Sequence, residues 1–366
     1  MERNKYKILT VGLIVILISA SFLFVSLSSR VGDKTGGSER ASLEYKGAVL
    51  AHIHRIGSGY GSGSSRNIHS HLKGIGYDTV QLNTFAYMRD RAETGLIVDG
   101  DPTMADRYLI DEIRNLHGSG FKVMLKPHIW IGGWNFDADN WRSKIDFTDS
   151  DKREEWFFNY RKFIIGQAML AEKTGVEILV VGTELVEVSK YTGEWRKLIE
   201  EVRKVYGGRL TYAAEGMNAK NIEFWDSLDY IGIDAYFPLT GKAAPALSEL
   251  VRGWKRHEPE IKELSEKYGK KIIFTEIGYK SVEGTAIKPW EWSDDGVASQ
   301  EEQALAFEAT SVVFRDKPYL AGVFVWKYFT DMDSEEKDNI EKGFTPYSKK
   351  AETKISAWFR EGQRNE

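Results

Sequence analysis

The chain has 366 residues, too many for a small module, and suits one large domain of about 250–300 residues with additional segments. Its net charge of −4 provides no basic surface of the kind that holds nucleic acid by its phosphates. It has no cysteine, which excludes disulfides, thiolate metal sites and a cysteine nucleophile.

The N-terminal segment is typical of an export signal or a membrane anchor. Three basic residues, Arg3, Lys5 and Lys7, precede residues 8–29, which carry no charge. Positive charges on this side keep the N-terminus in the cytoplasm and direct the remainder outside. We expect residues 1–30 to form a signal anchor or a signal peptide and residues 31–44 a flexible linker. The protein would then be membrane-anchored facing outside the cytoplasm, or secreted after cleavage.

Residues 45–362 alternate between strand-like and helical patterns. A Gly- and Ser-rich stretch, residues 57–65, is predicted to be a flexible loop, and no Lys-Ser or Lys-Thr pair follows it to make a Walker-type phosphate site. Apolar runs predict strands at residues 47–54, 77–83, 121–128, 178–183, 209–215, 228–236, 271–275 and 320–326. Apolar residues at helical spacing predict helices at residues 103–116, 150–173, 195–206, 244–268, 301–315 and 348–360.

This alternation predicts an α/β fold. Strands that alternate with helices form parallel sheets joined by crossover connections. Eight such units fit a closed (β/α)8 TIM barrel better than an open doubly wound sheet, which would usually have a glycine fingerprint at its first turn. We therefore predict one barrel domain over residues 45–362.

Two predicted strands end on a single glutamate. Glu184 follows residues 178–183, and Glu276 follows residues 271–275. Either residue alone could be an ion-paired strand end, because a buried carboxylate is costly without a partner. In a barrel, however, all strands end at one face, and we expect these two strands to lie across the mouth from each other. Paired carboxylates fit hydrolysis of glycosidic bonds, with Glu184 as acid/base and Glu276 as nucleophile. Tyr236 could donate a hydrogen bond to Glu276 or could be a core tyrosine at a strand end.

The other predicted strand ends and loops have polar and aromatic side chains suited to a hydroxyl-rich ligand with apolar faces. Trp326 could form a floor under a sugar ring or could pack within the mouth. His128 could bind a sugar hydroxyl or serve only the structure. The candidate substrate-binding residues are Asn83, His128, Trp130, Glu215, Tyr236, Trp290 and Trp326, and Trp134 and Trp292 lie in loops where sugar stacking is plausible.

Several motifs occur in the order expected of one family. They are LKPHIW (125–130), GTEL (182–185), LTYAA (210–214), FWDSLDYIGIDAY (224–236), FTEIGY (274–279) and PW (289–290). Over about residues 45–330 the chain resembles glycoside hydrolase family 113, whose retaining clan A barrels include endo-β-1,4-mannanases. The resemblance implies a mannanase-like enzyme with Glu184 as acid/base and Glu276 as nucleophile. Many clan A enzymes have Asn before the acid/base, but here Thr183 occupies that position, and Glu215 matches no family role.

Other functions remain open at this point. His52 and His54 would suit a metal-dependent amidohydrolase barrel, but the remaining ligands expected of such a site are missing. A non-catalytic carbohydrate-binding barrel, or a hydrolase of another β-glycan such as glucan or galactan, would have the same architecture. We expect no cofactor, no metal and no nucleic-acid partner, and a monomer that acts on a polysaccharide or oligosaccharide.

Overall fold

The structure is a computed structural model that describes residues 42–132, 138–293, 295–334 and 339–361. The predicted signal or anchor, most of the linker and Trp134 lie outside these residues. Within the described part of the chain, no helix has the length and apolar character needed to cross a membrane.

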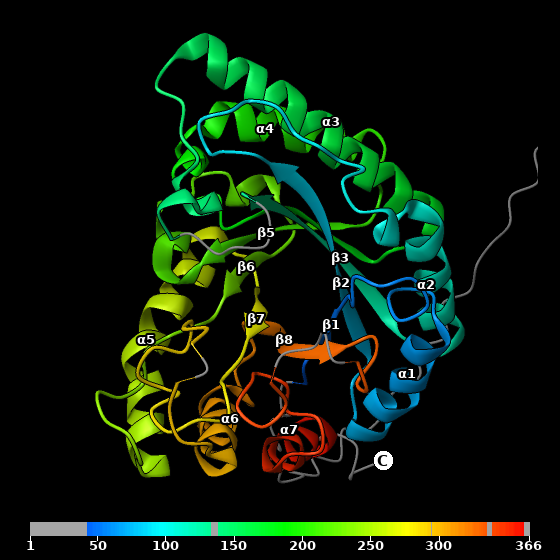
Figure 1. The fold of residues 1–366 in the computed structure, drawn as a ribbon. Helices are drawn as coiled ribbons and strands as arrows, with labels where there is room; N and C mark the ends of the chain where they lie inside the picture. The colour runs from blue at the N-terminus through cyan, green and yellow to red at the C-terminus, as the bar shows by residue number, and fades with distance from the viewer. Residues whose placement is uncertain (1–41, 133–137, 294, 335–338, 362–366) are drawn as a thin grey trace, which may run out of the picture. The chain divides into compact units, whose positions relative to one another are not determined.

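Eight parallel strands close into a barrel in sequence order, with β8 pairing back onto β1 (Figure 1). This confirms the predicted (β/α)8 fold. The strands are β1 (Tyr45–Ala51), β2 (Thr79–Met88), β3 (Lys122–Ile131), β4 (Ile178–Thr183), β5 (Arg209–Glu215), β6 (Ile231–Asp234), β7 (Ile272–Ile277) and β8 (Leu320–Phe329).

Helices surround the ring of strands on its outside (Figure 1). Between β5 and β6 the connection consists of two short 3-10 helices, η5 (Gly216–Asn221) and η6 (Trp225–Ser227), in place of an α-helix. The α-helices are α1 (Gly63–Ile75), α2 (Asp106–Gly118), α3 (Ser150–Thr174), α4 (Thr192–Arg203), α5 (Leu247–Tyr268), α6 (Gln300–Phe314) and α7 (Lys350–Arg360).

Capping residues explain where two of these helices begin. Asp149 accepts hydrogen bonds from the amides of Asp151 and Lys152, so α3 begins where it was predicted. Ser62 caps α1 in the same way, through the amide of Ser65. The predicted loop at residues 57–65 was therefore wrong in its second half, where the Ser-rich stretch is the first turn of a helix.

The apolar core has two parts. Inside the barrel, one cluster includes Val49, Met124, Val180 and Phe324. A larger cluster fills the space between strands and helices, and four tryptophans are fully buried: Trp156, Trp195, Trp225 and Trp254. Much of the aromatic excess is thus core, and the polar residues of the barrel interior stand out as candidates for function.

Candidate active site

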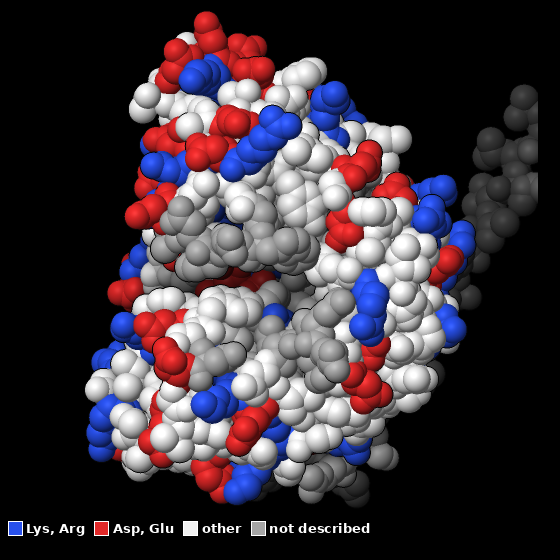
Figure 2. Space-filling model, in the orientation of Figure 1, with Lys and Arg blue, Asp and Glu red and all other residues white. Residues whose placement is uncertain are grey.

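The two candidate glutamates lie at the carboxyl ends of their strands. Glu276 is the fifth residue of β7, and Glu184 directly follows β4. The closed barrel order leaves β5 and β6 between them on one side and the other four strands on the other, so β4 and β7 lie across the mouth from each other, as we expected. The face seen in Figure 2 is hollowed near its centre, and acidic side chains are visible in the hollow.

The backbone is irregular at both glutamates. The β4–β5 pairing shifts register between Val180 and Thr183, and the β7–β8 pairing shifts between Phe274 and Ile277. Glu184 itself has φ of 52°, while its amide donates to the carbonyl of Ala213 over 2.8 Å. A left-handed conformation costs a glutamate roughly 1–3 kcal/mol, and both bulges and such strain cluster at functional sites.

Glu276 is held by one donor on each carboxylate oxygen. Lys126 Nζ lies 2.6 Å from Oε1, and the Tyr236 hydroxyl donates to Oε2 over 2.9 Å. The latter is the contact predicted for Tyr236. Burial, followed by the charge of Glu276, raises the pKa of Tyr236 well above its ordinary value, so the hydroxyl keeps the proton that it donates. Glu276 is only 6% exposed.

Glu184 has a different partner. Arg142, from the 3-10 helix η3 (Arg142–Lys144), donates to Glu184 Oε2 from Nη2 over 2.8 Å and from Nε over 3.2 Å. Its guanidinium also lies 4.1 Å from the ring centre of Trp141. No sequence pattern singled out Arg142, because it lies in a loop and its partner is 42 residues away.

The two glutamates belong to one electrostatic cluster. Lys126, Asp234 and Tyr236 surround Glu276, and the charge of Glu184 also shifts the pKa of each of these three groups. Lys126 was missed by sequence reasoning as a site residue, whereas Asp234 was recognised as a polar residue at the end of the sixth predicted strand. The available signal was a lysine in the middle of the apolar run that became β3, since Lys122 lies only at its start.

Glu215, the last residue of β5, adds a fourth carboxylate to this cluster. Burial raises its pKa, the charge of Glu184 raises it further, and Arg142 opposes both. Glu215 is also in register with Asp234 on β6. Its charge therefore belongs to the surroundings of Glu184.

Two predicted binding residues lie deeper than expected. Asn83 does not end its strand, because β2 continues to Met88, and its Oδ1 accepts a hydrogen bond from Gln81 over 3.0 Å. His128 is buried, and burial and the charges of Arg142 and Lys126 lower its pKa well below the ordinary value. Its Nε2 is buried and has no hydrogen-bond partner among the described residues.

Aromatic residues form two groups at the strand ends. Trp326 on β8 is met edge-on by Trp292, with ring centres 6.2 Å apart, and Trp292 also packs on Phe344. Trp130 on β3 is met edge-on by Trp141 at 5.5 Å and by Phe85 at 6.3 Å. Trp290 is 49% exposed, and the structure records no ring contact for it within the described chain, so its predicted role remains a prediction.

Thr183 and His52, which directly follows β1, have structural partners. The Thr183 hydroxyl donates to the carbonyl of Pro127 over 3.0 Å and so ties β4 to β3. His52 Nδ1 accepts a hydrogen bond from the amide of Tyr60, which leaves the ring proton on Nε2, where it is donated to Thr103. Although His52, His54 and Asp101 lie close enough to share an ion, a protonated Nε2 is not a metal ligand.

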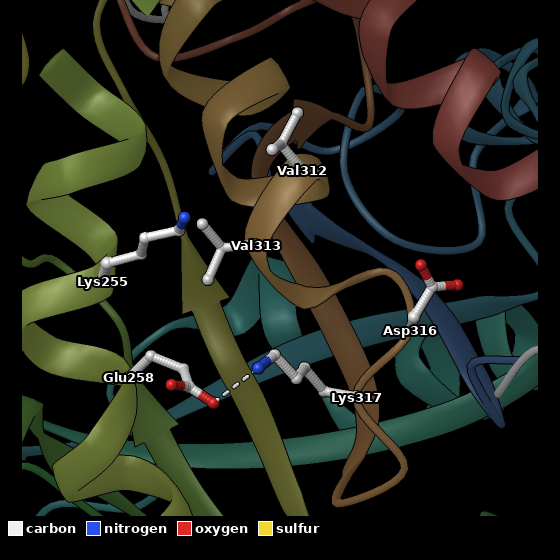
Figure 3. Close-up of a pocket in the computed structure, with 6 residues that line it drawn as sticks. All are labelled: Lys255, Glu258, Val312, Val313, Asp316 and Lys317. Atoms are coloured by element: carbon white, nitrogen blue, oxygen red, sulfur yellow. Dashed lines mark hydrogen bonds and ion pairs between the residues drawn. The ribbon is translucent and has the colours of Figure 1, made fainter. Parts of the chain in front are cut away.

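A hollow elsewhere on the surface is separate from this cluster. Figure 3 shows it between α5 and α6, where Glu258 pairs with Lys317 over 2.8 Å. Lys317 precedes β8, so the hollow lies toward the amino ends of the strands. Active sites of such barrels lie at the opposite face.

Comparison with known proteins found a matching family and several similar structures. The model of Glycoside Hydrolase Family 113 matches residues 57–349. A solved GH113 beta-1,4-mannanase is 26% identical, covering 87% of this chain and 99% of its own, with a TM-score of 0.76. The GH113 beta-mannanase AaManA from Alicyclobacillus acidocaldarius, solved with ManMIm, is 25% identical, covering 87% of this chain and 97% of its own, with a TM-score of 0.76.

More distant structures share the fold alone. A beta-glucuronidase from Ruminococcus gnavus is 12% identical with a TM-score of 0.57, and this chain covers 49% of its length. Among curated proteins, none matches this sequence significantly.

Proposed function

The chain belongs to glycoside hydrolase family 113, and on this premise we propose that it hydrolyses β-1,4-linked mannan by a retaining double displacement. Reaction type and substrate have different support. The paired glutamates support the mechanism, whereas mannan rests on the two solved relatives, which are beta-mannanases at 25–26% identity.

The observation that favours this mechanism is the unequal surroundings of the two carboxylates. Glu276 accepts hydrogen bonds from a lysine and a tyrosine, which suits a group that must stay ionised to attack. Glu184 lies beside Arg142 and near Glu215, so it has both a cation and a carboxylate as neighbours.

In the first step Glu276 attacks the anomeric carbon while Glu184 protonates the departing oxygen. In the second step Glu184 takes a proton from water, the water oxygen attacks the same carbon, and Glu276 leaves as a carboxylate. Trp326 with Trp292 on one side, and Trp130 on the other, would stack against sugar faces. His128, Asn83, Glu215 and Trp290 complete the proposed binding residues.

A panel of β-mannan, glucomannan, cellulose and galactan tests this proposal. We expect the wild-type chain to release reducing ends most rapidly from mannan. Glu184→Ala and Glu276→Ala should each lose at least about 1000-fold in turnover. Azide should partly rescue Glu276→Ala by attacking from the side of the missing carboxylate. Full activity in either variant would contradict the mechanism, whereas cleavage of cellulose or galactan but not mannan would replace only the substrate.

We propose that the N-terminal segment places the enzyme outside the cytoplasm. Support comes from the sequence, with three basic residues before an uncharged apolar stretch. Cell fractionation with N-terminal sequencing of the mature chain would separate the two forms. An intact chain in membranes indicates an anchor, a shortened chain outside the membrane indicates a cleaved signal, and an intact cytoplasmic chain would contradict both.

A further inference from the structure

Lys126 is fully buried in the barrel interior. It lies on β3, yet its ammonium group contacts carboxylates of β6 and β7, two strands that do not pair with β3. Such contacts can only run through the inside of the barrel. A buried ammonium group has a desolvation penalty of several kcal/mol, so both its partners and its task require an explanation.

Two carboxylates share this one cation. Lys126 Nζ lies 2.7 Å from Asp234 Oδ1 and 2.6 Å from Glu276 Oε1. Burial by itself would lower the pKa of Lys126, but the charges of Asp234 and Glu276 outweigh it and raise the pKa. The lysine is therefore a permanent cation at neutral pH.

Asp234 is fixed independently of Glu276. Its Oδ1 accepts hydrogen bonds from both Lys126 and the Thr275 hydroxyl, the latter over 2.7 Å. Burial, and then the charge of Glu276, raise the pKa of Asp234. Its Oδ2 has no hydrogen-bond partner in the described part of the chain, so this carboxylate is oriented through a single oxygen.

We propose that Lys126, anchored by Asp234, is the positioning residue of the nucleophile. This inference rests on the proposed function, in which Glu276 attacks the sugar. Lys126 holds Oε1 toward the barrel interior and keeps the carboxylate ionised, so that Oε2, beside Tyr236, is the oxygen that forms the glycosyl bond.

The shared partner explains why two carboxylates are needed. When Oε2 bonds to the anomeric carbon, Glu276 becomes a neutral ester and no longer balances the charge of Lys126. Asp234 still balances the charge of Lys126, so the ammonium group stays in place during both steps. When water attacks, the carbon–Oε2 bond breaks and its electron pair returns to Glu276, beside a cation that is already oriented. No proton moves to or from Lys126 in either step.

The test is the pH profile of kcat/KM on mannan for Lys126→Met, which keeps the chain length and removes the charge. Without the cation, Glu276 takes up a proton more readily. The acid limb should therefore move to higher pH by about 1–3 units, and kcat should fall about 100-fold or more. A matched control is Lys349→Met, because Lys349 is also buried but donates to the Ser281 hydroxyl and the Gly343 carbonyl. It should lower the melting temperature without moving the acid limb.

Asp234→Asn gives a second readout of opposite sign, which is needed if Lys126→Met does not fold. Removing the competing negative charge strengthens the hold of Lys126 on Glu276, so the acid limb should move to lower pH. An unmoved acid limb in a folded Lys126→Met chain, or in Asp234→Asn, would overturn the inference. Full activity of Glu276→Ala would instead overturn the proposed function, so the two failures are distinguishable.

Discussion

At the residue scale, the site contains six charged side chains, four carboxylates and two cations. Glu276 and Asp234 flank Lys126, whereas Glu184 and Glu215 lie with Arg142. Lys126 thus lies with one pair of carboxylates and Arg142 with the other. This division gives Glu184 and Glu276, which are the same residue type, different surroundings in one site.

Glu215 provides a direct test of that division. Burial and the charge of Glu184 raise the pKa of Glu215, so the two carboxylates lie close enough for their charges to interact. In Glu215→Gln, Glu184 loses a negative neighbour and gives up its proton more readily. The basic limb of kcat/KM on mannan should therefore move to lower pH, and an unmoved basic limb would show that Glu215 does not act on Glu184.

Single residues were predicted unevenly. Glu184 and Glu276 could be identified because each ends an apolar run. Tyr236 could be identified because it ends the predicted strand at residues 228–236. Lys126 and Arg142 could not, since their partners are 150 and 42 residues away and only the closed barrel brings them together. Sequence patterns reveal interactions between residues close together in the chain, whereas this charge cluster joins residues far apart in it.

At the element scale, the end of β4 depends on close packing behind it. A Cβ atom on Gly182 would lie 2.7 Å from both Trp195 of α4 and Tyr212 of β5. Those rings are fully buried, and the Tyr212 hydroxyl also accepts a hydrogen bond from the amide of Leu185. Only glycine allows β4 to pack this closely against the two rings. This close packing sets the position of Glu184, two residues further along the chain.

Gly182→Ala should therefore lower stability by about 1–3 kcal/mol, the usual cost of overpacking a core. It should also reduce kcat, because Glu184 lies two residues further along. Gly193→Ala is the matched control, since Gly193 lies in α4 with nothing within 4 Å of an added Cβ, and alanine favours a helix. Urea unfolding of both variants measures the difference, and equal stabilities would contradict the packing account.

Element prediction succeeded where local signals were strong. The helix α3 was predicted almost to its ends, because an aspartate cap precedes it and Gly175 ends it. The extensions of β2 and β8 beyond the predicted ends were missed, since residues there have partners supplied only by the neighbouring strands. The register shifts beside Glu184 and Glu276 likewise have no local signal.

At the scale of the whole molecule, the fold keeps two buried histidines, His52 and His128, neutral. Burial lowers the pKa of His52 from 6.5 to about 3, and that of His128 also falls well below the ordinary value. The unfolded chain binds protons at these histidines from about pH 6.5 downward, whereas the folded chain does not. Stability should therefore be complete above pH 6.5 and be lost as the pH falls toward 3.

For His52 alone, the loss at pH 5 is about 2 kcal/mol relative to pH 7. His52→Asn keeps an acceptor for the Tyr60 amide and cannot take up a proton. Although this variant is expected to be less stable at pH 7, its stability difference between pH 7 and pH 5 should shrink by about that amount. His257→Asn, at a partly exposed site on α5, should leave the difference unchanged. Urea unfolding at the two pH values measures both, and an unchanged difference in His52→Asn would contradict the assignment.

The barrel as a whole was the most predictable feature, because alternation of strands and helices over 300 residues leaves few other topologies. That architecture brings residues 126, 184, 234 and 276 to one site, and the central claim is that Glu276 acts there as the nucleophile. A mannobiosyl fluoride with fluorine at C-2 of the reacting sugar should trap the covalent intermediate, and mass spectrometry of a proteolytic digest should locate it. We predict a label on the peptide that contains Glu276; a label on Glu215, Glu184 or another residue would contradict the claim.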